Sequence, residues 1–73
     1  MIIITGPQGT DEERGLIAEM AGFHQGLPAY EVVGRWAIAT VLYCLAGWEC
    51  CPVAVADVQI AETLGLPVFL LAV

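Results

Sequence analysis

The chain of 73 residues contains no lysine and only two arginines, Arg14 and Arg35, against eight acidic residues, and its formal net charge is −6. Proteins that bind nucleic acids or anionic membrane surfaces do so through clustered lysine and arginine side chains. The composition therefore argues against a nucleic-acid partner and against a membrane surface.

Long uninterrupted apolar runs are also missing. The longest uncharged runs, residues 36–48 and 63–73, are well short of the ~20 residues that a membrane-spanning helix needs. No basic segment precedes an apolar one, so we expect no signal peptide. The three cysteines are odd in number and Cys50 and Cys51 are adjacent, which is not typical of a disulfide framework. We expect a reducing, cytoplasmic environment.

Apolar residues are abundant, since 59% of the chain is hydrophobic and only 14% is charged. A chain of this length forms one domain and buries only ~60% of its unfolded surface. The apolar material exceeds what one small core can cover. We therefore expect residues 1–73 to form a single domain that assembles as a homo-oligomer, and the alternative is a larger protein trimmed to its core.

The second half of the chain has the pattern of a strand, a helix and a strand. An apolar run ends at Gly47, a helical pattern begins at Pro52 and stops at Gly65, and a second apolar run fills residues 67–73. Proline suits the first helical position and glycine suits a left-handed cap. Strands joined in this way are parallel, and ligands bind beyond their carboxyl ends. The pattern predicts a binding edge at residues 47–56.

The first half begins with a predicted buried strand at residues 1–5 and a turn at residues 6–9. Thr10 and Glu13 have the spacing of a capping box, which predicts a helix from Asp11 to Phe23. Leu16, Met20 and Phe23 share one sector of that helix and are predicted to face the core, flanked by Ile17.

A strip of small residues, Gly15, Ala18 and Gly22, follows the other side of this helix. Two glycines cost a helix ~1 kcal/mol each relative to alanine. Either another backbone packs closely against the strip, or the helix is poorly formed.

Residues 24–40 carry the weakest signals. We expect a turn at residues 25–28, a short strand or a helix start at residues 29–33, a helical turn at residues 35–39 and a strand at residues 40–45. The whole pattern predicts an α/β fold, with a small parallel sheet of three or four strands and two main helices.

The loop from Gly6 to Thr10 lies between a strand and a helix, as a phosphate-binding loop does. It lacks the Lys-Ser/Thr pair that holds phosphate and magnesium, and the acidic residues after it repel phosphate. We predict no nucleoside triphosphate and no other cofactor. The loop is either a plain turn or a polar loop in which Gln8 contacts a neutral ligand.

The second helix places a carboxylate among its apolar residues. Val53, Ile60 and Leu64 are predicted to face the sheet together with Ala61, and Asp57 falls among them. A charge there is costly unless it is hydrogen-bonded or near the open edge. Asp57 therefore either reaches solvent or the turn at residues 47–51, or it has a functional role.

The two adjacent cysteines stand at the start of this helix, where the helix dipole can acidify a thiol. Packing and capping are the favoured role of Cys50 and Cys51. A metal site needs further ligands at suitable spacing, and His24 is the chain's one histidine, so we predict no metal.

Two segments carry a resemblance to a known family. Leu45-Ala46-Gly47-Trp48-Glu49 and, after the helix, Ala61-Glu62-Thr63-Leu64-Gly65-Leu66-Pro67-Val68 resemble nucleoside 2-deoxyribosyltransferase-like proteins. The start of the chain, Ile4-Thr5-Gly6-Pro7, agrees loosely with the family's first strand and turn.

The resemblance implies a flavodoxin-like fold and cleavage or transfer of the N-glycosidic bond of 2′-deoxynucleosides. Asp57 falls at the position of the family's nucleophilic glutamate. The resemblance further implies a nucleoside pocket whose substrate-binding residues are Gly6, Pro7, Gln8, Gly47, Trp48, Glu49 and Cys51.

Three departures from the family pattern concern the site itself. Asp57 is one methylene shorter than glutamate, Cys51 stands where serine is usual, and Val53 replaces a glycine that lets a ligand approach the backbone. Two hypotheses follow. The protein is a nucleoside deoxyribosyltransferase or N-glycosidase with Asp57 as nucleophile, or it is a non-catalytic binding or assembly module with a degenerate site.

Overall fold

The computed structural model of the chain describes residues 1–71 and shows an α/β fold of the flavodoxin or Rossmann type. Four parallel strands form one sheet in the order β2-β1-β3-β4. The strands and the two main helices are β1 (Ile2–Thr5), α1 (Asp11–Phe23), β2 (Leu27–Pro28), β3 (Val41–Leu45), α2 (Pro52–Thr63) and β4 (Val68–Leu71). This confirms the predicted fold class. Ala72 and Val73, predicted as strand, lie outside the described residues.

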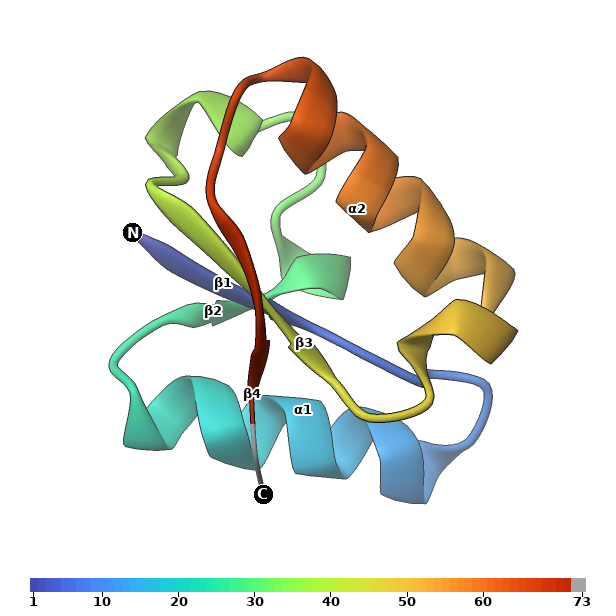
Figure 1. Cartoon of the computed structure of the whole chain (residues 1–73). Coiled ribbons are helices and arrows are strands. Elements are labelled where there is room, and N and C mark those ends of the chain that lie inside the picture. The colour runs from blue at the N-terminus through green and yellow to red at the C-terminus, as the bar shows by residue number, and fades with distance from the viewer. Residues whose placement is uncertain (72–73) are drawn as a thin grey trace.

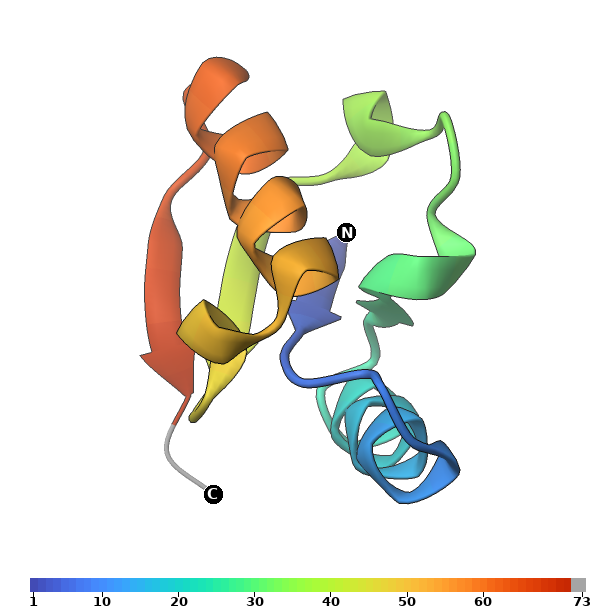
Figure 2. The ribbon, with the colours of Figure 1, turned by 90° about the vertical axis from the view of Figure 1, so that its right-hand side faces the viewer.

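The two helices lie on opposite sides of the sheet (Figures 1 and 2). Helix α1 packs against β1 and β2, and α2 packs against β3 and β4. Because side chains alternate along a strand, Ile3 and Leu42 join the core on the α2 side, whereas Ile4 and Leu45 join the core on the α1 side. Neither helix within residues 1–71 has the length and apolar character needed to cross a bilayer.

The helix boundaries follow the local signals that the sequence carries. The Thr10 hydroxyl accepts a hydrogen bond from the Glu13 amide, and the Glu13 carboxylate accepts one from the Thr10 amide, both at 3.1 Å. Helix α2 begins at Pro52, and Gly65 follows it with a φ of +73°. The predicted capping box, first helical position and left-handed cap are therefore confirmed.

Only part of the predicted core face of α1 is confirmed, since Met20 and the flanking Ile17 pack into the core on the α1 side of the sheet. Ile17 and Ala21 are buried against the sheet, while Leu16 and Phe23 are exposed. The buried face is thus turned by about one residue, or ~100°, from the predicted one. The small side chain of Ala21 lets the helix lie close to the sheet, and the larger residues are left outside.

Helix α2 shows the same effect. Its buried residues are Ala54, Val58 and Ala61, whereas the side chains of Val53, Ile60 and Leu64, which were predicted to face the sheet, are exposed. Only Ala61 of the predicted apolar face is buried. Two alanines bring the helix close to β3 and β4, and Asp57 flanks their face.

The segment between α1 and β3 differs most from expectation. Part of the predicted turn at residues 25–28 is the strand β2, which pairs with Ile3 and Ile4 of β1. Residues 29–33, an expected strand or helix start, contain a 3₁₀ helix, η1 (Ala29–Glu31). Helix η2 (Trp36–Ile38) confirms the helical turn predicted at residues 35–39. Strand β2 is short because Pro28 cannot donate a hydrogen bond to a ladder.

Two glycines, Gly15 within α1 and Gly26 just before β2, give a matched test of the packing. A Cβ atom at Gly15 would meet no described atom within 4 Å, whereas a Cβ at Gly26 would lie 2.4 Å from the Ile2 carbonyl oxygen. We expect Gly15→Ala to raise the free energy of unfolding by about 1 kcal/mol through helix propensity. Gly26→Ala should lower it, because β1 or β2 must move. Urea unfolding measures both, and a stable Gly26→Ala variant would contradict the observed approach of β2 to β1.

Candidate functional site

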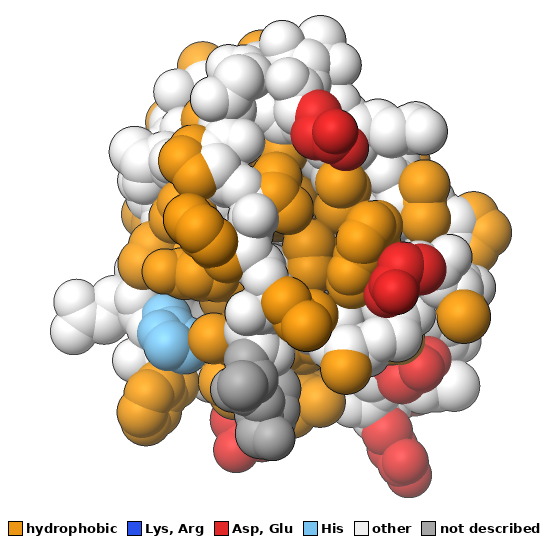
Figure 3. Space-filling model, in the orientation of Figure 1, with side chains coloured by type: hydrophobic (Ala, Val, Ile, Leu, Met, Phe, Trp, Pro, Cys, Tyr) orange, Lys and Arg blue, Asp and Glu red, His pale blue; other side chains and the backbone are white. Residues whose placement is uncertain are grey.

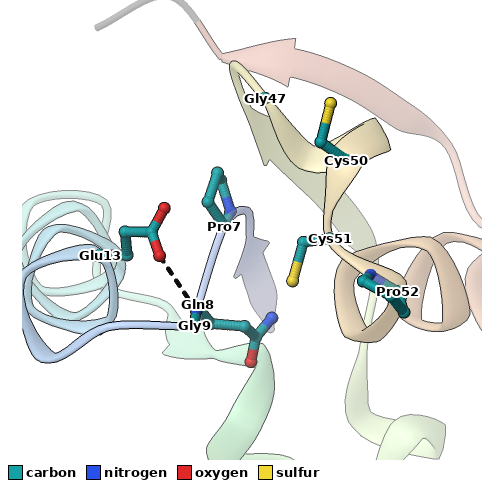
Figure 4. A pocket seen from close by; sticks show the side chains of 8 residues that line it. All are labelled: Pro7, Gln8, Gly9, Glu13, Gly47, Cys50, Cys51 and Pro52. Atoms are coloured by element: carbon teal, nitrogen blue, oxygen red, sulfur yellow. Dashed lines mark hydrogen bonds between the residues drawn. The ribbon is translucent and has the colours of Figure 1, made fainter.

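The carboxyl ends of β1 and β3 meet at one edge of the sheet, and a pocket of about 400 Å³ lies there (Figure 4). Its walls come from the loop after β1, from helix α1, from the 3₁₀ helix η3 (Trp48–Cys50) and from the start of α2. The lining residues are Pro7, Gln8, Gly9, Glu13, Gly47, Cys50, Cys51 and Pro52. The volume falls within the ~300–1,000 Å³ range of small-molecule sites.

Two glycines allow the loops of the pocket to approach each other. Gly47 has a φ of +89°, a conformation that side chains disfavour, and a Cβ there would lie 3.2 Å from the Pro7 ring. A Cβ at Gly6 would lie 2.8 Å from the Cβ of Leu45. Both contacts bring the loop after β1 against the end of β3.

Gln8 is the polar group that is fixed most firmly in the pocket wall. Its side chain is only 8% exposed. Its Nε2 amide donates to Thr5 Oγ1 and to the Gly6 carbonyl at 3.2 Å, and to Asp57 Oδ2 at 3.4 Å. The backbone carbonyl of Gln8 accepts from the Arg14 guanidinium at 3.0 Å. Gln8 is therefore held by hydrogen bonds to residues of β1, α1 and α2.

Asp57 lies behind Gln8 rather than in the pocket lining. The carboxylate is half-buried on α2, and its Oδ2 accepts a hydrogen bond of 2.7 Å from the Thr5 hydroxyl. Burial raises the pKa of Asp57 above its ordinary value, although the hydrogen bonds from Thr5 and Gln8 act in the opposite direction. The Oδ1 atom accepts no hydrogen bond from residues 1–71.

Glu13 is the carboxylate that does line the pocket, and it is already engaged. Its Oε1 accepts hydrogen bonds from the backbone amides of Gly9 and Thr10, both at 3.1 Å. These bonds close the loop after β1 onto the start of α1. The Glu13 carboxylate therefore has a structural role, because its hydrogen bonds stabilise the pocket wall.

The cysteines occupy three different environments. Cys51 stands at the N-cap position of α2 without a side-chain capping hydrogen bond, and the backbone amides of Ala54 and Gln8 near its sulfur lower the pKa of its thiol. In Figure 4 its sulfur points toward Gln8, whereas the sulfur of the exposed Cys50 points away from Gln8. Burial, followed by the charges of Asp57 and Glu49, raises the pKa of Cys44 from 9.0 to about 11.

The structure brings some of the predicted site residues together and leaves others apart. Pro7, Gln8, Gly47 and Cys51 line the pocket, and Gly6 supplies the carbonyl that accepts from Gln8. Trp48 instead packs against the core on the α2 side, and Glu49 is exposed outside the lining.

Sequence reasoning did not single out Thr5 for the site. A hydroxyl at the last position of an otherwise apolar strand, at the ligand edge, is the signal that could have identified it. Glu13 was interpreted only as a capping residue, and it has both roles. Within residues 1–71, no three His, Cys, Asp or Glu side chains gather in a way that would hold a metal ion.

Comparisons of the chain with protein-family models, with curated proteins and with solved structures give no match. The case for a function therefore depends on the geometry of this pocket and on the resemblance of the two motifs.

The raised pKa of Asp57 predicts a specific dependence of stability on pH. At a pH between the ordinary Asp57 pKa of 3.8 and its raised pKa in the folded state, the folded protein binds more protons than the unfolded chain. The free energy of unfolding therefore falls as the pH rises through this window. Asp57→Asn keeps an oxygen that accepts from Thr5 and Gln8 but cannot ionise. We expect urea unfolding between pH 3.5 and 7 to show this fall in the wild type and to show it reduced in Asp57→Asn.

The matched control is Glu62→Gln, which removes one carboxylate from an exposed position of the same helix. It should keep the wild-type pH dependence in this window. Equal pH profiles for Asp57→Asn and the wild type would contradict the assignment of a buried, destabilised charge to Asp57.

Proposed function

We propose that this protein binds a small, uncharged polar molecule of the nucleoside or nucleobase class in the pocket between the loop after β1 and the start of α2. The observation that carries the proposal is Gln8, a nearly buried amide held in place by three acceptors at the wall of a pocket with apolar neighbours. A polar group that is fixed before the ligand arrives lowers the entropic cost of binding.

The charges around the pocket favour an uncharged ligand. Glu13 lines the wall, the chain has a net charge of −6, and lysine is absent. The nearest cation, Arg14, donates to the Gln8 carbonyl and pairs with Asp11. No described cation lines the pocket, so a phosphate group would be repelled there. This favours a nucleoside or a base over a nucleotide.

The shape and chemistry of the walls suit a planar ring. Pro7 and Pro52 offer apolar surfaces on the two sides of the pocket, and the cavity of about 400 Å³ is of small-molecule size. The Nε2 donors of Gln8 are bonded to Thr5, Gly6 and Asp57, so its amide oxygen is the group left to accept from an N–H or O–H of a nucleobase or nucleoside. The resemblance to nucleoside 2-deoxyribosyltransferase-like proteins points to the same class of ligand.

The positions and hydrogen bonds of the two acidic residues near the pocket, Glu13 and Asp57, favour binding without catalysis. A nucleophile must come within ~3–3.5 Å of the atom it attacks. Glu13 is committed to the amides of Gly9 and Thr10, and Asp57 lies behind Gln8 outside the lining. Substrate chemistry at Asp57 would require Gln8 to move and to lose its own hydrogen bonds.

A second candidate function is cleavage of the N-glycosidic bond, and one observation favours it. Thr5 and Gln8 both bind Oδ2 of Asp57, which leaves Oδ1 oriented and without a hydrogen bond from residues 1–71. In this reaction Oδ1 would bond to C1′ of the sugar while the base leaves with the electron pair of the glycosidic bond and takes up a proton. Water or a second base would then displace Asp57 from the sugar.

The test of the binding proposal is calorimetric titration with uncharged nucleosides, free bases and nucleoside 5′-monophosphates. We expect saturable binding of at least one uncharged compound and weaker binding of its monophosphate. Gln8→Leu should lower the affinity by roughly tenfold or more, because the ligand loses its hydrogen bond to the Gln8 amide oxygen. Gln59→Leu, an exposed position on α2, is the matched control and should bind as the wild type does.

Chromatographic measurement of base release from the same compounds separates the two candidates. Binding without release supports the proposed function. Release that disappears in Asp57→Ala would establish the glycosidic reaction instead. If neither nucleosides nor bases bind to the folded protein, the proposed ligand class is wrong.

A further inference from the structure

The strand β4 forms one edge of the sheet, and its outer side carries free backbone groups. The Leu42 amide donates to the Pro67 carbonyl at 3.0 Å. This bond shows which residues of β4 direct their backbone groups toward β3. In a parallel ladder, alternate residues bond to the same neighbour. Phe69 and Leu71 therefore bond to β3, and Val68 and Leu70 direct their N–H and C=O groups outward. No strand within residues 1–71 pairs with them.

The two edges of this sheet are protected very differently. Strand β2 forms the other edge. Its length of only two residues and its proline, Pro28, both discourage further pairing. Strand β4 has the sequence Val-Phe-Leu-Leu, without a charge or a proline. An exposed, apolar and regular edge of this kind is a template for pairing with another chain.

Beside this edge lies a contiguous aromatic surface. Helix α1 covers β1 and β2, and next to it the rings of Phe23, His24, Tyr43 and Phe69 follow one another with centroid distances of 5.1, 6.0 and 6.1 Å. Phe23 is 80% exposed, Phe69 is 54% exposed and Leu70 is 69% exposed. Figure 3 shows the face that holds β4, with hydrophobic side chains across its middle and acidic side chains at its rim.

We propose that a second copy of this chain covers the edge, with the two β4 strands paired antiparallel about a twofold axis at Phe69. Val68 of one copy then lies opposite the partner's Leu70, and the two residues exchange N–H···O=C bonds in both directions. Phe69 faces the partner's Phe69 in the intervening non-hydrogen-bonded pair. The two four-stranded sheets join into one continuous sheet.

The second copy is the partner that this edge fits, because the chain itself presents the complementary strand. A twofold interface uses the same patch on both copies, so an uncharged strand with outward Val68 and Leu70 pairs with itself without a mismatch. Two chains of net charge −6 repel each other least over an uncharged surface, and neither β4 nor the aromatic surface contains an acidic residue.

The size of the surface is consistent with this partner. If a large apolar side chain presents ~200 Å² when fully exposed, Phe23 and Phe69 on the α1 side and Leu70 on the opposite side of β4 together expose roughly 400 Å² around this edge. A standard interface buries about 800 Å² per partner, about a fifth of the 4250 Å² surface of this chain. The strand edge and the residues that flank it supply the remainder.

Light scattering on the purified chain tests the proposal. The expected mass of the wild type is twice the 7.8 kDa of one chain. Phe69→Lys places two like charges opposite each other at the twofold axis and should weaken the dimer roughly a hundredfold or more. Val33→Lys, at an 81% exposed apolar position in the segment that follows β2, the strand at the other edge, is the matched control and should stay dimeric.

Amide-resolved hydrogen exchange of the wild type keeps the test decisive if Phe69→Lys fails to fold. In the proposed dimer the amides of Val68 and Leu70 are protected, as those of Phe69 and Leu71 are. A wild type that is monomeric overturns the proposal. So does a folded Phe69→Lys variant that remains dimeric, or rapid exchange at Val68 and Leu70 alongside slow exchange at Phe69 and Leu71.

Discussion

The site depends on one interaction, the hydrogen bonds that Asp57 accepts from Thr5 and Gln8. A half-buried carboxylate is costly without such partners, and here the partners come from the end of β1 and from the loop that follows it. The same contacts join α2 to β1 and fix Gln8 at the pocket wall. Asp57 therefore acts first as a positioning residue, and its charge organises a neutral amide that is presented to the ligand.

Small residues determine how this interaction can form. Ala54 and Ala61 bring α2 close to the sheet, so that Asp57 reaches Thr5, and Gly6 and Gly47 let the two loops meet above them. The close approach has a second effect. Larger apolar residues such as Leu16 and Ile60 are left on the outside of both helices, and Phe69 is exposed because α1 covers β1 and β2 rather than β4. The composition that forms the pocket thus also produces a surface suited to assembly.

The sequence predicts those features that depend on neighbouring residues. The capping box at Thr10 and the helix start at Pro52 are local, and both are confirmed. The buried faces of the helices depend on how closely each helix approaches the sheet, which periodicity does not reveal. Helical spacing placed Asp57 toward the sheet together with Val53, Ile60 and Leu64, which are exposed. Its partner Thr5 lies 52 residues away in the chain, and no local signal predicted that contact. The two-residue strand β2 was missed because it is defined by pairing with β1 rather than by its own sequence.

The hydrogen-exchange rate of the Gln8 side-chain amide, measured by nuclear magnetic resonance in the wild type and in Asp57→Ala, tests most directly whether Asp57 fixes this amide. Gln25 and Gln59 are exposed and serve as internal references. The two Nε2 protons of Gln8 should exchange more slowly than those of the references, and the Asp57→Ala variant should lose most of this protection. Exchange of Gln8 in the wild type as fast as that of Gln25 and Gln59 would contradict the central role of Asp57, because the amide would then not be fixed by Thr5 and Asp57.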